Sequence, residues 1–457
     1  MKLIKSIFRE YDIRGTYPEE INEDSISKIA QAIALKCKEE GVLDISVGRD
    51  GRLSGKTLLN AMCDSLSRSD ISVTNIGLVT SPILYYAAKK SNSKSGIMIT
   101  GSHNPKNDNG IKMVINNKPV SGTEIYSLTH STSELQDATE IKIKTDIIKD
   151  YINDVLGKIK LNKTKKIKVV IDCGNGAAGC VAPELFKKLG CEVINLFSEI
   201  DGNFPNHHPD PGKLENLQDL IATVKKENAD LGLAFDGDGD RVGLVTGKGE
   251  VVFPDKIMML FAKDILENNN GGQIIYDVKC SNSLAKIIED CGGEPIMSPT
   301  GHFHIKNALR RTNALLAGEM SGHIFFNDNW YGFDDGHYAG VRIIDLINRS
   351  HYSIDEMISK LPELFSTPEL NIHVSDDNKF DIVKRFADEC ILDGRKITID
   401  GLRIEFENGW GLLRASNTTP KLVLRFEGNS ENDLNSIQKN FMNEFKRICP
   451  EIDSTLH

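Results

Sequence analysis

The sequence predicts an α/β protein with three consecutive α/β units of mixed, mainly parallel sheets, then a C-terminal α+β domain with an antiparallel sheet, around a central cleft. Three observations lead to this fold. The chain has 457 residues, enough for three or four domains of roughly 100–200 residues each. Apolar runs of strand length alternate with amphipathic stretches, as in parallel sheets with crossover helices. The last part of the chain instead shows strands joined by short turns.

Two α/β units are expected in the first half of the chain. Residues 1–150 form the first, with a helix expected at 23–40 and strands at 44–50, 71–77 and 95–100. The same pattern restarts in residues 151–252, with strands expected at 166–173, 191–197 and 229–236. The charged stretch 141–168 joins the two units and is expected to be a solvated helix without a chemical role.

A third unit and a different last domain complete the chain. Residues 253–365 form the third unit, with strands expected at 272–278, 293–299 and 313–319. Residues 366–457 form the C-terminal domain, with antiparallel strands expected within 369–375, 395–416 and 421–428. Asp400-Gly401 is a hairpin-turn signal, and a helix is expected on each side of these strands.

Composition excludes several classes of function. The chain has 55 Lys and Arg against 65 Asp and Glu, a net charge of −10, and no basic block, so nucleic acid is not an expected partner. No apolar run of about 18 residues and no signal core are present, so we expect a cytoplasmic protein without membrane contact. Nine scattered cysteines without a C-x-x-C pair predict reduced thiols.

Each α/β unit ends its last predicted strand in an unusual polar loop. These loops are TGSHNP (100–105), DGDGDR (236–241) and GEMSGH (318–323). In open α/β sheets, ligands bind outside the carboxyl ends of the strands. We therefore expect the three loops to face one cleft.

The loop DGDGDR has the composition of a divalent-cation site. Asp236, Asp238 and Asp240 alternate with glycines, which lets the backbone curl so that three hard oxygens converge. An EF-hand is excluded, because Arg241 and Gly247 stand where that loop needs Gly and Glu. An acidic surface turn is the alternative, but three aspartates at the end of a buried strand repel one another unless a cation intervenes.

Two further loops suit a phosphorylated sugar. In GEMSGH, Glu319, Ser321 and His323 offer polar groups to hydroxyls. The loop RASNTTP (414–420) and the next strand offer guanidinium, hydroxyl and amide groups to a phosphate, from Arg414, Ser416, Asn417, Thr418, Thr419 and Arg425. For Arg425, an exposed position on the strand surface is the alternative.

These four loops resemble the signature loops of the α-D-phosphohexomutases. TGSHNPKNDNGIKM, DGDGDR, GEMSGH and RASNTTP occur in the order typical of that superfamily, and the resemblance runs from FREYDIRG (8–15) to the C-terminal domain. Within the superfamily, the chain is most similar to the bacterial phosphomannomutase/phosphoglucomutase branch, through GEMSGH, FPNHHPDP (204–211), DVKCS (277–281), TGH (300–302) and GFDDG (332–336).

The resemblance implies an intramolecular phosphotransferase that interconverts hexose 1-phosphate and hexose 6-phosphate, with mannose and/or glucose as the sugar. Ser102 would carry the phosphoryl group, and hexose 1,6-bisphosphate would be the intermediate and activator. One Mg2+ per chain would bind a phosphoserine oxygen and the three aspartates of DGDGDR, while Arg14 and Arg241 offset the remaining charge. Sugar phosphates would be the partners, and the protein would be a monomer or weak dimer.

A proton must leave the attacking sugar hydroxyl. Lys112 and His302 are the candidate bases, and Lys279 is a further contact to the sugar or phosphate. Lys112 is equally well explained as a cation that neutralises the phosphoserine. His103 is expected to point away from Ser102 in an extended loop, with a role in loop structure or a phosphate contact.

Two other functions remain as alternatives. Gly174, Gly176 and Gly179 follow a strand in the spacing of a dinucleotide site, with Glu199 at a suitable distance, as in an NAD-dependent oxidoreductase. That function leaves the serine loop, the three aspartates and RASNTTP without a purpose, so the glycines are interpreted as packing and turn residues. Within the family, phosphoglucosamine mutase is the alternative.

Overall fold

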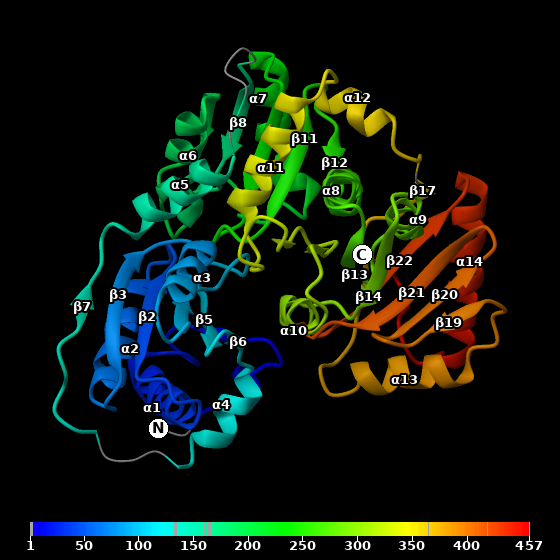
Figure 1. The fold of residues 1–457 in the computed structure, drawn as a ribbon. Coiled ribbons are helices and arrows are strands. Elements are labelled where there is room, and N and C mark those ends of the chain that lie inside the picture. Colours follow the sequence, from blue (N-terminus) through cyan, green and yellow to red (C-terminus); the bar gives the residue numbers. More distant parts are fainter. Residues whose placement is uncertain are drawn as a thin grey trace.

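The structure, a computed structural model, describes residues 3–131, 135–159, 161, 166–363, 365–417 and 419–456. Its four sheets follow in chain order and are mixed in the first three units and antiparallel in the C-terminal domain. Figure 1 shows the units along an arc, from blue at the N-terminus to red at the C-terminus. The predicted fold class is confirmed.

The first unit has a sheet in the order β1-β5-β4-β2-β3-β7, with β6 beside β5. Strand β5 runs antiparallel to β4 and places Lys112 opposite Met98. Helix α1 begins with a capping box between Asn22 and Ser25 and ends close to the predicted residue. The elements are β1 (Ile13–Thr16), α1 (Glu23–Glu39), β2 (Asp44–Arg49), α2 (Gly55–Ser67), β3 (Ser72–Leu78), α3 (Ser81–Lys90), β4 (Gly96–Ile99), β5 (Asp108–Ile115), β6 (Lys118–Pro119), α4 (Gly122–Leu128) and β7 (Lys142–Ile143).

The second unit has the sheet order β12-β11-β10-β8-β9, in which β10 is parallel to β8 and antiparallel to β11. The acidic loop 236–241 joins β10 to β11 at the carboxyl end of β10. The elements are α5 (Ile147–Lys158), β8 (Lys168–Asp172), α6 (Ala182–Leu189), β9 (Glu192–Leu196), α7 (Gln218–Glu227), β10 (Leu231–Phe235), β11 (Val242–Thr246) and β12 (Val251–Val252).

The prediction of a solvated helix over 141–168 was wrong. Among the described residues of this stretch, only Ile147–Lys158 are helical. The side chains of Tyr151 and Val155 are fully buried in a core that the first three units share. The Tyr151 hydroxyl donates to Asp335 at 2.9 Å. An apolar stripe at helical spacing lies among the charges of this stretch, so α5 is a packing element.

The third unit has the sheet order β14-β13-β15-β16. Strand β13 is parallel to both neighbours, and β16 closes the sheet antiparallel to β15, so that loop 318–323 lies between them. The elements are α8 (Pro254–Asn269), β13 (Gly272–Asp277), α9 (Asn282–Asp290), β14 (Gly293–Ser298), α10 (His302–Thr312), β15 (Leu316–Gly318), β16 (Ile324–Phe326), α11 (Gly336–Arg349) and α12 (Ile354–Ser359).

The C-terminal domain has one face covered by helices and the other face against the third unit. Helices α13 and α14 both pack on the first face, where the rings of Phe386 and Phe441 lie 5.1 Å apart. On the opposite face, Trp410 and Leu412 contact Val278 of the third unit. The elements are β17 (Phe365–Ser366), β18 (Leu370–His373), α13 (Lys379–Glu389), β19 (Arg395–Ile397), β20 (Leu402–Phe406), β21 (Gly409–Ala415), β22 (Lys421–Gly428) and α14 (Glu431–Ile448).

Two features bear on the class of protein. All nine cysteines are free, and most are buried. Among the described residues, we find no helix that is both long and apolar enough to span a bilayer.

Candidate active site

Ser102 lies directly after β4 and faces the acidic loop of the second unit. Its side chain is 1% exposed, and its Oγ donates to Oδ2 of Asp236 at 2.9 Å. The backbone of Ser102 is left-handed, with φ of 48°. Such a conformation is uncommon outside glycine and points to a site where geometry is imposed. The sequence placed the serine and the aspartates in one cleft, and the structure brings them into contact.

The serine loop is held from behind by a buried arginine. The Arg52 guanidinium is fully buried. It donates to the carbonyl oxygen of Ser102 at 2.8 Å and also to that of Asn104. Asp50 accepts from the hydroxyl of Thr100 at 2.7 Å and forms a buried pair with Arg52. Charged groups therefore fix the main chain that carries the serine.

His103 does not point away from the serine, as the sequence analysis expected. Its Nδ1 lies 3.1 Å from the Oγ of Ser102. The left-handed backbone at Ser102 turns the loop, so the alternation expected of an extended segment does not apply. Burial, with the nearby cations Arg241 and Arg14, holds the pKa of His103 well below its usual range, so the imidazole is neutral.

The three aspartates of DGDGDR converge at full burial. Oxygen atoms of Asp236, Asp238 and Asp240 lie within 4.8 Å of one another, and none of the side chains is exposed. Burial and the neighbouring carboxylates raise the pKa of Asp236 well above its usual range. The Oδ1 atoms of Asp238 and Asp240 are buried without a hydrogen-bond partner. Unpartnered carboxylate oxygens in this arrangement fit a divalent cation.

The glycines of this loop permit the close approach. A Cβ at Gly237 would lie 2.3 Å from the carbonyl oxygen of Ser102. Gly239 has a φ of 76°, and a Cβ there would lie 2.4 Å from His337. A side chain at Gly237 would push the acidic loop away from the serine loop, and one at Gly239 would clash with His337.

Lys112 reaches the same cluster from β5. Its Nζ lies 2.8 Å from Asp238 and 2.5 Å from Asp240, both at Oδ2, and its side chain is 4% exposed. Burial alone would lower the pKa of Lys112, but the two carboxylates outweigh it and raise the pKa well above its usual range. In this arrangement Lys112 is a fixed cation, which fits the charge-neutralising alternative better than a base.

Two arginines flank the serine. Arg14 donates to Asn104 and to Asp12, each at 2.6 Å, and so lies beside the serine loop. Arg241 donates from Nε to the Nε2 of His323 at 3.0 Å, and the same Nε lies 3.9 Å from Asp236. Both positions agree with the predicted place of a cation near a phosphoserine.

The loop GEMSGH brings Glu319 and His323 toward the same cleft. Glu319 is 1% exposed and accepts from the backbone N–H of Gly301. The Ser321 hydroxyl oxygen lies 3.5 Å from the Oε2 of Glu319. The Nδ1 of His323 lies 3.3 Å from Asp334. A carboxylate beside the Nδ1 of an imidazole orients the ring.

His302 stands at the start of α10, and its ring centre lies 5.7 Å from that of His323. Its Nδ1 is buried without a hydrogen-bond partner. Burial and the nearby Lys306 hold the pKa of His302 well below its usual range, so it is a neutral group.

The predicted phosphate loop joins β21 to β22. Arg414 donates to Asp400 at 2.8 Å, and the hydroxyls of Ser416 and Thr419 lie 2.7 Å apart. Asn417 donates to the hydroxyl of Tyr11 in the first unit. Thr418 lies outside the described residues.

Lys279 approaches the phosphate loop from the third unit. Its Nζ lies 2.9 Å from Glu369, whose other oxygen lies 3.9 Å from Lys421. Lys279, Lys421 and Arg414 together outweigh burial and lower the pKa of Glu369 to about 2. The Glu369 carboxylate is therefore an anion among the cations of this region.

Arg425 lies neither on an exposed strand surface nor in the phosphate loop. It is 1% exposed, pairs with Asp255 at 3.2 Å and donates to the carbonyl oxygen of Lys279. Its guanidinium also lies 5.8 Å from the ring of Trp410. The sequence pattern of alternating strand residues does not reveal that this face packs against the third unit, so the exposed-surface prediction for Arg425 is wrong. Its contact with a phosphate stays a prediction.

Three residues near the site were not predicted. Tyr11 links Asn417 to the carbonyl oxygen of Thr300 at 2.9 Å, and its place in FREYDIRG, three residues before Arg14, was the signal. Asp334 lies in GFDDG, a motif that carried part of the family resemblance but no predicted role for this residue. Glu369 lies between β17 and β18 of the C-terminal domain, and no local pattern singles it out as a partner of Lys279.

The glycines of the dinucleotide-like pattern have packing roles. Gly176 lies against the backbone of Gly237, and a Cβ at Gly179 would lie 2.1 Å from the carbonyl oxygen of Ser198. Ala177 donates its N–H to the Gly237 carbonyl at 2.9 Å. This loop therefore supports the acidic loop from behind.

Four family descriptions match consecutive parts of the chain. They are phosphoglucomutase/phosphomannomutase alpha/beta/alpha domain I at residues 5–136, domain II at 149–249, domain III at 253–365 and the C-terminal domain at 369–444.

Similar proteins cover nearly the whole chain. The phosphomannomutase/phosphoglucomutase of Pseudomonas syringae pv. tomato is 48% identical over 98% of this chain and 97% of its own length. The phosphoglucomutase of Neisseria gonorrhoeae is 46% identical, with 96% of each chain covered. A crystal structure of a phosphoglucomutase/phosphomannomutase family protein from Burkholderia thailandensis is 42% identical and matches with a TM-score of 0.92 over 99% of both chains.

Proposed function

Because the chain belongs to the phosphoglucomutase/phosphomannomutase family and is a phosphohexomutase, we propose that it interconverts the 1- and 6-phosphates of mannose and/or glucose through phosphorylated Ser102. The observation that carries this proposal is the contact between Ser102 and Asp236 within a buried cluster of three aspartates. The phosphoryl group passes from Oγ of Ser102 to the free sugar hydroxyl, which gives hexose 1,6-bisphosphate. The other phosphate then returns to the serine after the sugar has turned round.

The acidic cluster is proposed to hold one Mg2+ together with an oxygen of phosphorylated Ser102. Asp236, Asp238 and Asp240 supply hard oxygen ligands, and the unpartnered Oδ1 atoms support this assignment. When bound, the metal draws charge from phosphorus and so assists in-line attack. Arg14 and Arg241 offset the charge that remains on the phosphoryl oxygens.

The proton of the attacking hydroxyl needs an acceptor in the same cleft. Of the two predicted bases, Lys112 is held by carboxylates, while His302 is neutral and has a buried Nδ1 without a hydrogen-bond partner. His323, predicted only as a sugar contact, has Asp334 beside its Nδ1 and is a third candidate. We assign proton transfer to the histidine pair and charge neutralisation to Lys112.

The existing phosphate of the substrate is proposed to dock opposite the serine. Arg414, Ser416, Asn417, Thr418 and Thr419 form this phosphate clamp, with Lys279 from the third unit. A substrate phosphate must compete with Glu369 for the Lys279 ammonium group, because the two are 2.9 Å apart. Glu319 and Ser321 are proposed to contact the sugar hydroxyls.

We further propose that the protein works in the cytoplasm as a monomer or weak dimer, without nucleic-acid or membrane partners. Phosphoglucosamine is the alternative sugar, because the polar groups near Glu319 do not distinguish hexoses by charge. Hexose 1,6-bisphosphate would act as activator by phosphorylating Ser102.

A 31P NMR time course tests the proposed function. Mannose 1-phosphate is incubated with the enzyme, Mg2+ and a trace of glucose 1,6-bisphosphate, and then glucose 1-phosphate is used in its place. We expect the 6-phosphate signal to grow with the wild type and not with Ser102→Ala. Release of inorganic phosphate would identify a hydrolase instead, and an unchanged 1-phosphate signal for both sugars would direct the assay to phosphoglucosamine.

A further inference from the structure

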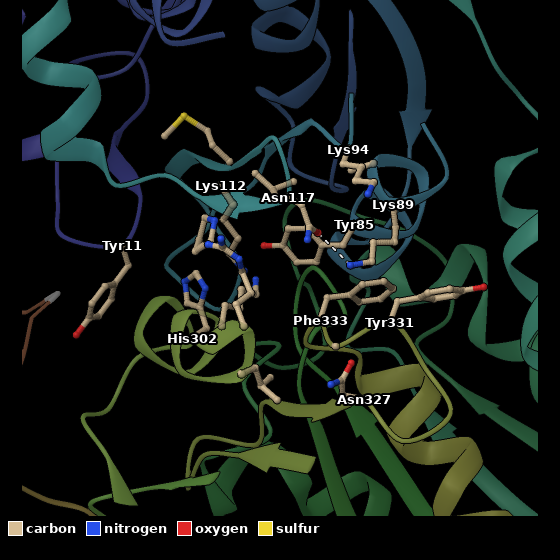
Figure 2. A pocket seen from close by; sticks show the side chains of 18 of the residues that line it. Tyr11, Tyr85, Lys89, Lys94, Lys112, Asn117, His302, Asn327, Tyr331 and Phe333 are labelled. Atoms are coloured by element: carbon tan, nitrogen blue, oxygen red, sulfur yellow. Dashed lines mark hydrogen bonds between the residues drawn. The ribbon is translucent and has the colours of Figure 1, made fainter. Parts of the chain in front are cut away.

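A cavity of about 230 Å³ lies between the first and third units, behind the candidate active site. Lys112 and His302 line one end, and Lys89 and Lys94 line the other (Figure 2). Aromatic side chains, among them Tyr85 and Phe333, line the part between these ends (Figure 2). The cavity therefore continues from the catalytic region into a part of the molecule that the proposed reaction does not use.

The charges that line this cavity are all of one sign. Lys89, Lys94, Lys112, Lys306 and Arg310 are among its lining residues, and none of the lining residues that the structure describes is Asp or Glu. The chain as a whole carries a net charge of −10, so this is a local reversal of sign. Cations gathered in a concave site attract anions far more effectively than the same cations on a flat surface.

The two ends differ in whether their cations are neutralised. Lys112 contacts Asp238 at 2.8 Å, and Lys306 contacts Asp334 at 2.6 Å. Within the described part of the chain, Lys89, Lys94 and Arg310 have no ion pair. This second group is called the cation cluster below.

The three cations of the cation cluster repel one another, as expected when no carboxylate neutralises them. Burial, and then the nearby positive charges of Lys94 and Arg310, lower the pKa of Lys89. The Lys89 ammonium donates to the side-chain oxygen of Asn117 at 3.0 Å, which orients it without cancelling its charge (Figure 2). Lys94 and Arg310 are exposed and come from different units, Lys94 after α3 and Arg310 from α10.

We propose that the cation cluster binds the phosphate or diphosphate group of a small organic metabolite, whose uncharged part lies along Tyr85 and Phe333. Lysine and arginine side chains are the groups that hold phosphates by charge and hydrogen bonding. Three unneutralised cations match the charge of a diphosphate better than that of a neutral or cationic ligand. The aromatic and amide groups of the cavity suit an organic body with few charges.

Because the cavity reaches Lys112 and His302, the bound metabolite regulates the reaction from behind the cleft. This regulatory consequence rests on the proposed function, whereas binding itself does not. The metabolite is thus an effector that occupies a second site, separate from the phosphate clamp.

Isothermal titration of the metal-free protein at low salt tests binding, with inorganic phosphate, pyrophosphate and guanosine diphosphate as probes. The cavity variant carries Lys89→Gln, Lys94→Gln and Arg310→Gln. The control variant carries Lys187→Gln, Lys225→Gln and Lys226→Gln, three exposed lysines of α6 and α7 that remove the same charge elsewhere. We expect at least about tenfold weaker pyrophosphate binding in the cavity variant and wild-type binding in the control.

The probes also identify the class of metabolite. Tighter binding of guanosine diphosphate than of pyrophosphate supports an organic ligand, and the reverse order would overturn the assignment of an organic body to Tyr85 and Phe333. Equal binding of all probes by wild type and cavity variant would overturn the proposal. Circular dichroism spectra of the three proteins confirm that each is folded.

Failure of this proposal and failure of the proposed function are separable. Arg414→Gln weakens the phosphate clamp but leaves the cation cluster intact. If pyrophosphate binds at the cation cluster, Arg414→Gln should bind it like the wild type, whereas the cavity variant should not. We expect guanosine diphosphate to lower the mutase rate of the wild type and control variant but not of the cavity variant. Inhibition that is identical in all three proteins would show that no effector acts through this cavity.

Discussion

Two lysine–carboxylate arrangements in this molecule differ in burial and in what surrounds them. Between the first and second units, Lys112 contacts Asp238 and Asp240, and all three side chains are nearly or fully buried. At the phosphate clamp, Lys279 contacts Glu369, whose side chain is 38% exposed. Removing one member of a buried charge cluster costs much free energy of folding, so such a cluster holds its side chains in fixed positions. A partly exposed ion pair contributes little free energy, so its members can exchange partners. The first suits phosphoryl transfer, and the second suits reversible docking of a phosphate.

The largest effect is expected from Asp238→Asn in the buried cluster. The change removes one proposed metal ligand and one partner of Lys112, so kcat should fall by about a hundredfold or more. Steady-state kinetics across a Mg2+ titration measure this loss, with a higher Mg2+ requirement as its signature. An unchanged Mg2+ requirement would contradict the metal assignment.

Lys112→Met should destabilise the protein strongly in metal-free buffer. It leaves Asp238 and Asp240 buried without the cation that contacts them, which costs about 3–5 kcal/mol in comparable buried clusters. Because a divalent cation replaces the lost charge, Mg2+ should restore part of the melting temperature. The comparison is thermal unfolding with EDTA and with Mg2+, and equal losses in both would mean that the metal does not bind at these aspartates.

Arg414→Gln should act on binding more than on chemistry. If the clamp contacts the phosphate that does not react, as proposed, KM for the hexose phosphate should rise about tenfold while kcat changes less. Asn408→Gln, in a turn of the same domain away from the loop, is the control. A kcat loss larger than the KM increase would place Arg414 at the reacting phosphate.

The smallest effect, and the one of opposite sign, is expected from Glu369→Gln. Without its charge, Glu369 no longer competes with substrate for Lys279, so KM should fall a few-fold. Initial rates at several ionic strengths measure the change, which should shrink as salt screens the cations. A raised KM would show that Glu369 instead holds Lys279 in its binding position.

Local sequence pattern predicted most of the elements and the loops that bear chemistry. Strand periodicity predicted β2, β4, β10 and β22 close to their observed bounds, because buried strands contain apolar residues in a regular spacing. The alternation of Asp and Gly predicted the convergence of carboxylates, since small residues allow only a tight turn there. The prediction for α5 failed because an apolar stripe was hidden within a charged segment.

The sequence by itself determined the fold class, the order of four units and the residue types of the reacting groups, since these follow from periodicity and short motifs. Only the tertiary structure decided which groups meet. It placed His103 beside Ser102, buried Arg425 between two domains and put Glu369 among the clamp cations. It also left Lys89, Lys94 and Arg310 without an ion-pair partner among the residues that the structure describes. The physical reason is that charge pairing and burial depend on contacts between residues far apart in the chain, for which local spacing carries no signal.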